Sequence, residues 1–363
     1  MKKRRRKTRR IKPFRFIFSI LFFVAIVVGG IKLISIIKDD KAPKIIENLE
    51  NKFIEQHGKI TIKNIDTDRQ FPLKNSQFSI TNIETGVLVD ILVTDKDGLA
   101  TSDLLDYHNI YEIKQVGLNP YYQSSEGDSL TVEINKDNHE ILIKNRLFEH
   151  IKHVSYTEDG EISIDEVYID VPTVMQNPEL PNGCEITSLT TVLNYKGYAV
   201  DKLEMADIYL PKVPFYRVDE QLYGADPYIA YAGDPRETSG FFSYAPPIIK
   251  AANNYLDVVQ GKEEPRNISN STHEKIIEYL EQGVPVVIWV TLDLSEPMLN
   301  YSWILIDSGE MKDMPVNLHC VVLNGYAGDN VHVMNPLEGQ VEYNADDFFQ
   351  SYIELGSHAL IIK

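Results

Sequence analysis

Cysteine is scarce in this chain. Only Cys184 and Cys320 occur among 363 residues. The sequence also has no H-E-x-x-H motif, no paired C-x-x-C motif and no glycine-rich phosphate loop. These absences leave metal and nucleotide sites without support, so we expect no metal and no cofactor. The open question is whether each cysteine is a buried apolar residue, half of a disulfide or a nucleophile.

Positive charge is scarce outside the N-terminus. Residues 1–15 contain ten Lys or Arg and no acid, whereas the rest contains 26 basic and 53 acidic residues, a net charge of −27. The strong negative charge of residues 16–363 argues against nucleic acid as a partner. With 43% hydrophobic and 25% charged residues, the composition is that of a globular protein, and its length favours two domains with additional segments.

One long apolar run follows the basic tail of residues 1–15. "FIFSILFFVAIVVGGI" (16–31) contains nothing more polar than Ser19, and "LISII" continues the run after Lys32. Residues 16–37 therefore predict a membrane-spanning helix of ~20 residues, with Lys32 reaching the interface. A cleaved signal peptide is the alternative, but its apolar region is usually shorter and no small-x-small site precedes "KDDKAPK". We favour a single-pass anchor in the cell membrane, with a cytoplasmic N-terminus and everything after residue 37 outside.

The pattern changes twice after this anchor. Residues 38–57 are charged, with apolar residues at helical spacing, and predict a helical stalk. From residue 58, short alternating or β-branched runs such as "KITIKNI", "VLVDILVT" and "EILIKN" are separated by Asp, Asn, Gly and Pro clusters. These runs predict a small all-β sandwich.

The segment 58–147 resembles the prealbumin-like Cna B-type domains of Gram-positive surface proteins. The resemblance is carried by "GKITIKNID" (58–66), "PLKNSQFSI" (72–80), "TDKDGLATS" (94–102), "YEIKQVGLNPYY" (111–122) and "ILIKN" (141–145). Many such domains form a Lys–Asn isopeptide bond, and the resemblance points to Lys63 and Asn145 as partners. Gln115 stands where the assisting acid should be. An amide cannot shuttle the proton, so we expect no bond and a spacer domain.

Residues 148–166 are polar, have no clear period and predict a linker or edge structure before a second domain at 167–363. In this domain "PNGCEITSLTTVLNYKGY" (181–198) predicts a helix that starts at Cys184 and ends near Gly197. The dipole and free N–H groups of a helix N-terminus stabilise a thiolate. Position alone leaves nucleophile and buried core residue equally supported.

A nucleophilic thiolate needs an imidazole partner. "NLHCVVLNGY" and "VHVMNPLEG" predict two strands joined by a tight turn. If the hairpin is centred on Ala327, His319 and Asn335 face one another, and the amide oxygen can orient the imidazole. His332 would point to the other face. Gln176, eight residues before Cys184, offers an N–H for a developing oxyanion. Taken alone, a strand histidine such as His319 is normally a core residue, and Gln176 is an ordinary loop residue; the amide opposite His319 is what favours a site.

The second domain resembles the papain-like cysteine peptidases of the C-39-like group, related to bacteriocin-leader processing peptidases. The resemblance runs from "VPTVMQNPELPNGCEITSLTTVLNYKGY" through "DPRETSGFFSYAPPIIKAANNYL" and "LEQGVPVVIWVTLD" to "NLHCVVLNGY" and "VHVMNPLEG". It implies an α+β fold, with Cys184 as nucleophile, His319 as base, Asn335 as third member and Gln176 as oxyanion amide. The family usually has Asp before Pro at the third position, so Asn335 removes one negative charge.

The sequence thus predicts a membrane-anchored cysteine peptidase that hydrolyses peptide or amide bonds of a peptide or protein outside the cell. Two alternatives remain open: a non-catalytic surface binding protein, in one form with a Cys184–Cys320 disulfide, and a Cys-His transpeptidase. Strand parity argues against the disulfide, because Cys320 follows His319 and would face away from it. The substrate and the oligomeric state are left open by the sequence.

Overall fold

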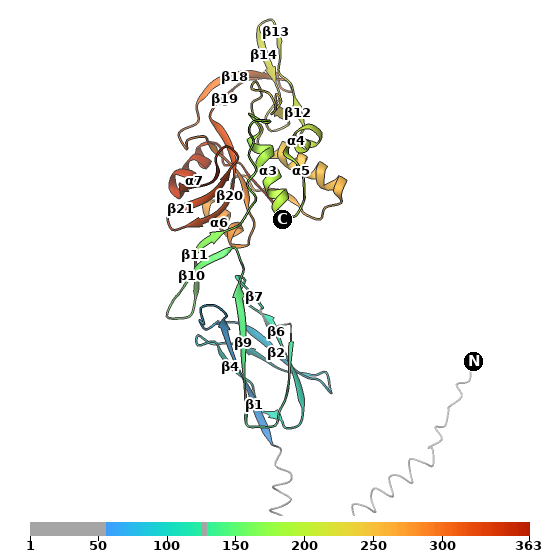
Figure 1. Cartoon of the computed structure of the whole chain (residues 1–363), viewed down its shortest axis with the longest axis vertical. Helices are drawn as coiled ribbons and strands as arrows, with labels where there is room; N and C mark the ends of the chain where they lie inside the picture. Colours follow the sequence, from blue (N-terminus) through green and yellow to red (C-terminus); the bar gives the residue numbers. More distant parts are fainter. Residues whose placement is uncertain (1–55, 125–128) are drawn as a thin grey trace, which may run out of the picture.

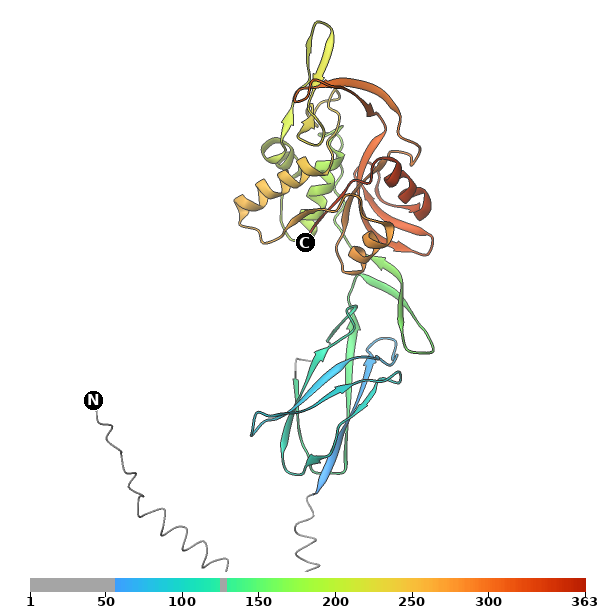
Figure 2. The same cartoon turned by 180° about the vertical axis from the view of Figure 1, so that it is seen from behind.

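The computed structural model describes residues 56–124 and 129–363. In these ranges the chain forms a β-sandwich followed by an α+β domain (Figures 1 and 2). The predicted basic tail, membrane helix and nearly all of the stalk (38–57) lie outside the described residues. Among the helices that are described, none is long and apolar enough to cross a membrane.

The sandwich consists of two sheets. One has the order β4-β1-β9-β7, with β5 also paired to β1, and the other has the order β3-β2-β6-β8. The strands are β1 (His57–Asp66), β2 (Gln77–Asn82), β3 (Leu88–Val93), β4 (Leu99–Thr101), β5 (Leu105–Asp106), β6 (Ile110–Gly117), β7 (Tyr122–Ser124), β8 (Ser129–Glu133) and β9 (Asn138–Leu147).

Alternation along the strands builds the core of the sandwich. Ile60 and Ile62 of β1 are completely buried, as is Ile80 of β2, and Phe78 and Ile113 are nearly so. Residues between them face solvent, as expected for sheets with one covered face. The predicted all-β domain is therefore present at the predicted place.

The same alternation determines the candidate isopeptide pair. Lys63 is exposed, because the inward positions of β1 are Ile60, Ile62 and Asn64. The side chain that meets Asn145 is Asn64, whose Oδ1 accepts a hydrogen bond of 2.6 Å from Asn145 Nδ2. The assignment of Lys63 as the partner of Asn145 was therefore wrong by one position, since a one-residue step on a strand reverses the face.

Residues 148–166 form most of an antiparallel hairpin made of β10 (Ile151–Tyr156) and β11 (Ile162–Tyr168). β11 pairs with β20 (Leu318–Ala327) of the second domain, so the hairpin is an edge of the central sheet. It also contacts the sandwich, where Phe71 stacks on Tyr156 with ring centroids 4.0 Å apart. Leu73 and Leu147 of the sandwich belong to the same buried cluster as Ile151. The predicted linker is thus packed against both domains.

The second domain contains a mixed set of helices and strands. The helices are α3 (Cys184–Tyr195), α4 (Lys202–Glu204), η1 (Met205–Tyr209), α5 (Ala245–Val259), α6 (His273–Glu281) and α7 (Ala345–Glu354). The strands are β12 (Lys212–Val213), β13 (Tyr216–Val218), β14 (Gln221–Gly224), β15 (Tyr231–Ala232), β16 (Pro265–Asn267), β17 (Val286–Thr291), β18 (Leu299–Leu305), β19 (Met311–Pro315), β20 (Leu318–Ala327), β21 (Asn330–Asn335), β22 (Gly339–Asn344) and β23 (Ala359–Ile362).

The central sheet has the order β10-β11-β20-β17-β23-β16, and β21 and β22 extend it from β20. All six residues of β17 are buried, which explains its continuous apolar sequence. Helices α3 and α5 lie on one side of this sheet and α7 on the other (Figures 1 and 2). A smaller sheet, β13-β14-β18-β19, forms the end of the domain farthest from the sandwich. The α+β architecture follows the expectation.

The exposure of Lys63 gives a direct prediction. The full chain should have the intact mass that its sequence requires, because the Lys63 amine does not reach the buried Asn145 side chain. High-resolution mass spectrometry measures this. A deficit of one ammonia molecule that disappears in Lys63→Arg would contradict the prediction.

Candidate active site

Cys184 is the first residue of helix α3. Residues 184–193 are all buried, so α3 is enclosed on every side rather than along one apolar stripe. The preceding Pro-Asn-Gly segment ends the loop, and the thiol group lies at the helix N-terminus as predicted. The N–H of a first helical residue has no acceptor within the helix, so the N–H of Cys184 is available to a ligand.

His319 and Asn335 come together, although the predicted register of their hairpin was wrong. Ala327 pairs with Asn330, and a register shift lies between Leu323 and Gly325. The centre of the hairpin therefore lies beyond Ala327, and His319 and Asn335 are not directly opposite. The observed pairing is displaced from the predicted one by two positions. Because side chains alternate with a period of two, His319 and Asn335 still lie on the same face of the sheet. His319 Nε2 lies 2.9 Å from Asn335 Oδ1.

This contact assigns the tautomer of the imidazole. A carboxamide oxygen only accepts hydrogen bonds, so Nε2 of His319 carries the proton and Nδ1 has the free lone pair. Asn335 is itself held in place: its Oδ1 accepts the N–H of Leu337 at 2.9 Å, and its Nδ2 donates to Tyr343 Oη at 3.0 Å. The amide is therefore a fixed acceptor, and it leaves Nδ1 to act as a base.

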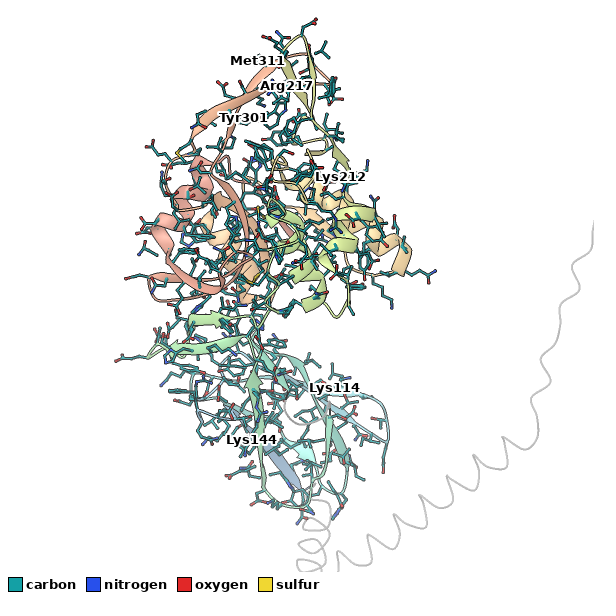
Figure 3. The ribbon with its side chains drawn as sticks, turned by 45° about the horizontal axis from the view of Figure 1, so that its top comes forward. Lys114, Lys144, Lys212, Arg217, Tyr301 and Met311 are labelled. Carbon is teal, nitrogen blue, oxygen red and sulfur yellow. The ribbon has the colours of Figure 1, made fainter. Side chains whose placement is uncertain are left out.

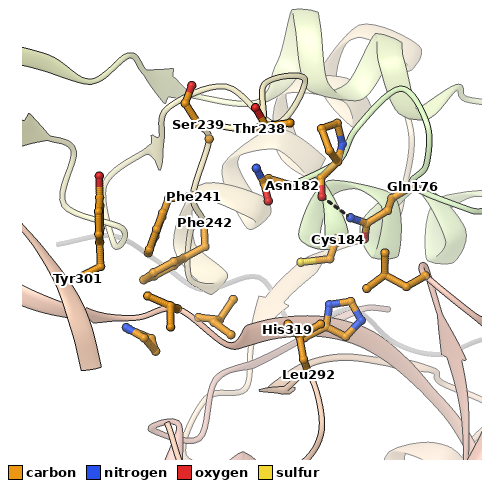
Figure 4. A pocket seen from close by; sticks show the side chains of 16 residues that line it. Gln176, Asn182, Cys184, Thr238, Ser239, Phe241, Phe242, Leu292, Tyr301 and His319 are labelled. Carbon is orange, nitrogen blue, oxygen red and sulfur yellow. Dashed lines mark hydrogen bonds between the residues drawn. The ribbon is translucent and has the colours of Figure 1, made fainter. Parts of the chain in front are cut away.

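Cys184, His319 and Gln176 line one pocket of about 460 Å³. Figure 4 shows Cys184 and Gln176 on the helical side of this pocket and His319 on the strand side. Gln176 is buried, and its Nε2 donates to the carbonyl of Pro181 at 2.9 Å. An amide nitrogen has two N–H groups, so one is left for an oxyanion formed near Cys184. Lys202 Nζ donates to the backbone carbonyl of Gln176 at 3.1 Å, which helps to fix the loop that carries Gln176.

Burial keeps the thiol and the imidazole of the resting site uncharged. It raises the pKa of the Cys184 thiol well above its usual value, and the charge of Glu185 adds to this effect. Burial also lowers the pKa of His319 to about 4, against a smaller opposing effect of the hydrogen bond to Asn335. The expected stabilisation of a thiolate by the helix N-terminus is outweighed. The free chain therefore holds a neutral thiol and a neutral imidazole at neutral pH.

The remaining sequence candidates do not line the pocket. Cys320 is completely buried outside the pocket, and both cysteines are free thiols. His332 contacts Tyr168 and Glu342, away from the pocket. No group of three or more His, Cys, Asp or Glu suited to a metal ion occurs in the described ranges.

Three residues of the site were not anticipated from the sequence. Glu185 is completely buried, and Oε2 of its side chain lies 3.4 Å from Cys184 Sγ. Tyr231 Oη donates to the carbonyl of Asn182 at 2.6 Å and supports the loop before Cys184. Tyr343 supports Asn335, as described above. Of these three, only Glu185 could have been noticed in the sequence, because it directly follows Cys184. An acid in the first turn of a helix is, however, usually explained by its interaction with the helix dipole.

The far end of the pocket is aromatic. Phe241 and Tyr301 stack with ring centroids 5.1 Å apart, and Phe241 also packs edge-on against Trp303. Figure 4 shows Tyr301 and the two Phe side chains at the opposite end of the pocket from Cys184. Tyr301 is carried by β18, which with β19 extends toward Met311 at the end of the domain (Figure 3). This arrangement gives the pocket an apolar wall beside the polar Cys-His end.

The lowered pKa of His319 predicts a pH-dependent stability. Between pH about 6.5 and 4 the unfolded chain takes up a proton at this residue and the folded chain does not. Its contribution to the free energy of unfolding is therefore complete above pH 6.5 and decreases as the pH falls to 4, by up to ~3 kcal/mol. His319→Gln keeps an N–H for Asn335 but cannot take up the proton, so it should lack this dependence. Urea denaturation of both proteins at several pH values measures it, and parallel curves would contradict the assignment.

Two family matches agree with this architecture. Residues 168–360 match the Peptidase_C39 like family, and residues 58–147 match a prealbumin-like fold domain. The chain is 29% identical over 191 residues to the uncharacterized protein YvpB of Bacillus subtilis, a match that covers 52% of this chain and 72% of that protein.

Solved structures give similar matches. A structure from Bacillus anthracis named as a C39-like peptidase is 28% identical, with a TM-score of 0.48, covering 55% of this chain and 97% of that one. A double glycine motif protease from an AMS/PCAT transporter, solved in complex with the leader peptide, is 19% identical, with a TM-score of 0.31, covering 58% and 99%. The family match at 168–360 spans more than half of the sequence. The chain therefore belongs to the Peptidase_C39 like family.

Proposed function

We propose that this protein is a cysteine peptidase that hydrolyses peptide or amide bonds through Cys184, His319 and Asn335. The observation that carries the proposal is the meeting of Cys184, His319 and Gln176 at one pocket, with Asn335 hydrogen-bonded to His319. They come from a loop, a helix N-terminus and two strands that are far apart in the sequence. Family membership agrees with this chemistry.

The reaction begins with proton transfer. His319 Nδ1 takes the proton of the Cys184 thiol as the sulfur attacks the substrate carbonyl, and the C–S bond forms while the carbonyl oxygen becomes negative. The Cys184 N–H and the second N–H of Gln176 stabilise this oxygen. Protonated His319 then gives its proton to the departing amine, and the C–N bond breaks to leave a thioester on Cys184.

Water completes the cycle. Neutral His319 removes a proton from a water molecule that attacks the thioester, and the acid product leaves as the thiol is restored. Asn335 keeps the imidazole in the same tautomer through both halves of the reaction. An amide at this position stabilises imidazolium less than a carboxylate would, so charge separation is confined to the steps with substrate bound.

We further propose that the peptidase acts outside the cell, anchored by residues 16–37. The apolar run with its basic flank supports this placement. β1 begins at the end of the sandwich farthest from the peptidase domain, which suits a spacer that carries the pocket away from the membrane (Figure 1). Two experiments test this. Protease added to intact cells should digest the peptidase domain, and fractionation of untreated cells should recover the whole chain with the membranes. Recovery of the whole chain in the soluble fraction would contradict it.

The central test uses Cys184→Ala with Cys320→Ala as the matched control. Turnover of a mixed peptide library, followed by mass spectrometry of the products, should be lost in Cys184→Ala because the acyl acceptor is gone. Cys320→Ala should keep most of its activity, since Cys320 lies outside the pocket.

Unchanged turnover in Cys184→Ala would overturn the mechanism. No turnover in the wild-type chain, with peptides still bound, would favour the alternative of a non-catalytic binding protein. Products joined to an added amine rather than to water would favour a transpeptidase.

A second prediction concerns Asn335. Asn335→Asp places a carboxylate beside His319, which raises the pKa of the imidazole and should move the acid limb of the kcat/KM profile to higher pH. Asn335→Ala removes the acceptor and should lower kcat on the order of a hundredfold through loss of orientation. Identical acid limbs in Asn335→Asp and the wild type would show that His319 is not the base.

A further inference from the structure

Glu185 is a buried titratable group that the reaction described above does not use. Its side chain is completely buried directly after the nucleophile. Oε1 accepts the backbone N–H of Ser243 at 2.9 Å, and Oε2 lies 3.4 Å from Cys184 Sγ. No Lys, Arg or His forms an ion pair with it in the described part of the chain. The Cys184 thiol is the donor to Oε2 in this contact.

The surroundings of Glu185 are uncharged or acidic. The titratable groups that face it are Cys184 on its own helix, Tyr231 of β15 and Cys320 of β20. The segment before α5 faces it with the Ser243 N–H. Burial, and after it the charge of Glu185, raises the pKa of Tyr231. Burial raises the pKa of Glu185 to about 7. No basic side chain beside it stabilises the ionised carboxylate against this effect.

The two protonation states of this carboxyl act oppositely on the sulfur. An ionised carboxylate accepts the S–H hydrogen and repels a thiolate, so it holds Cys184 as a thiol. A protonated carboxyl is an O–H donor, and a thiolate is a better acceptor than a thiol. The protonated form therefore favours the thiolate of Cys184, by a contact to the sulfur itself.

We propose that Glu185 is a positioning residue that controls the ionisation of Cys184, with its protonated carboxyl donating a hydrogen bond to the thiolate. This rests on the proposed role of Cys184 as nucleophile. Through Ser243 the same side chain also fixes the segment that carries Phe241 and Phe242, so the nucleophile and the aromatic wall share one anchor. No proton leaves Glu185 in the reaction: the thiol proton goes to His319.

Glu185→Gln is the matched variant. A glutamine keeps an oxygen for the Ser243 N–H and places a permanent N–H donor beside the sulfur, whereas Glu185→Ala removes both contacts. The measurement is the rate of Cys184 alkylation by iodoacetamide between pH 5 and 10, on the full chain in mild detergent, with site-resolved mass spectrometry. Glu185→Gln should move the profile to lower pH by roughly one unit, about tenfold faster labelling at neutral pH.

The profile separates this role from a purely structural one. Superimposable profiles for Glu185→Gln and the wild type, or slower labelling of Glu185→Gln at every pH, would overturn the proposal. Glu185→Ala should label more slowly than Glu185→Gln, because it has no donor. Alkylation needs no substrate, so a chain that fails to cleave peptides but shows the shift would contradict the proposed function and leave the role of Glu185 standing.

If Glu185→Gln does not fold, a second measurement on the wild-type chain tests the proposal. Infrared spectroscopy follows the carbonyl band of the protonated Glu185 in the wild-type chain as the pH rises. Alkylation of Cys184 removes its S–H and its capacity to form a thiolate, so it should shift the midpoint of this titration. An unchanged midpoint would overturn the proposal.

Discussion

The packing of helix α3 against strand β20 is the contact on which the site depends. Ser188 Oγ donates to the carbonyl of Cys320 at 3.1 Å, which fixes the helix along the strand. Cys184 lies one turn before Ser188, and His319 lies one residue before Cys320. This single register therefore brings the thiol group to the imidazole. Because residues 184–193 are buried throughout, the helix has no solvent-exposed side along which it could slide at low cost.

The same burial explains the electrostatics of the site. A charge in this pocket would lose its hydration, so the thiol and the imidazole are both neutral in the free chain. An amide at position 335 orients His319 without adding another buried charge. Glu185 differs from the thiol and the imidazole, because burial raises its pKa to about 7 and it therefore changes its charge near neutral pH. In the proposed mechanism, charge appears in the pocket only when a substrate supplies the oxyanion and the N–H donors stabilise it.

Local sequence patterns predicted much of this arrangement. The Pro-Asn-Gly turn located the start of α3, and strand parity put His319 and Asn335 on one face even though the turn and the register shift after Leu323 displaced the pairing by two positions. The alternation of side chains along β1 would also have excluded Lys63 as the partner of Asn145, an assignment that the resemblance to isopeptide-forming domains favoured. Regular alternation was therefore more reliable than motif position.

Long-range contacts could not be predicted in this way. The burial of Glu185 depends on Ser243, 58 residues later, and the support of Asn335 depends on Tyr343 in the next strand. The linker is polar and without a clear period, and it gave no sign that its last residue, Glu166, pairs with Ala327 of β20. The most direct test of the account is acyl transfer to Cys184. Mixing the full chain with a peptidyl p-nitrophenyl ester should release a burst of one p-nitrophenolate per chain and leave the acyl group on Cys184, located by mass spectrometry. An absent burst, or acylation at Cys320 or at lysines instead, would contradict it.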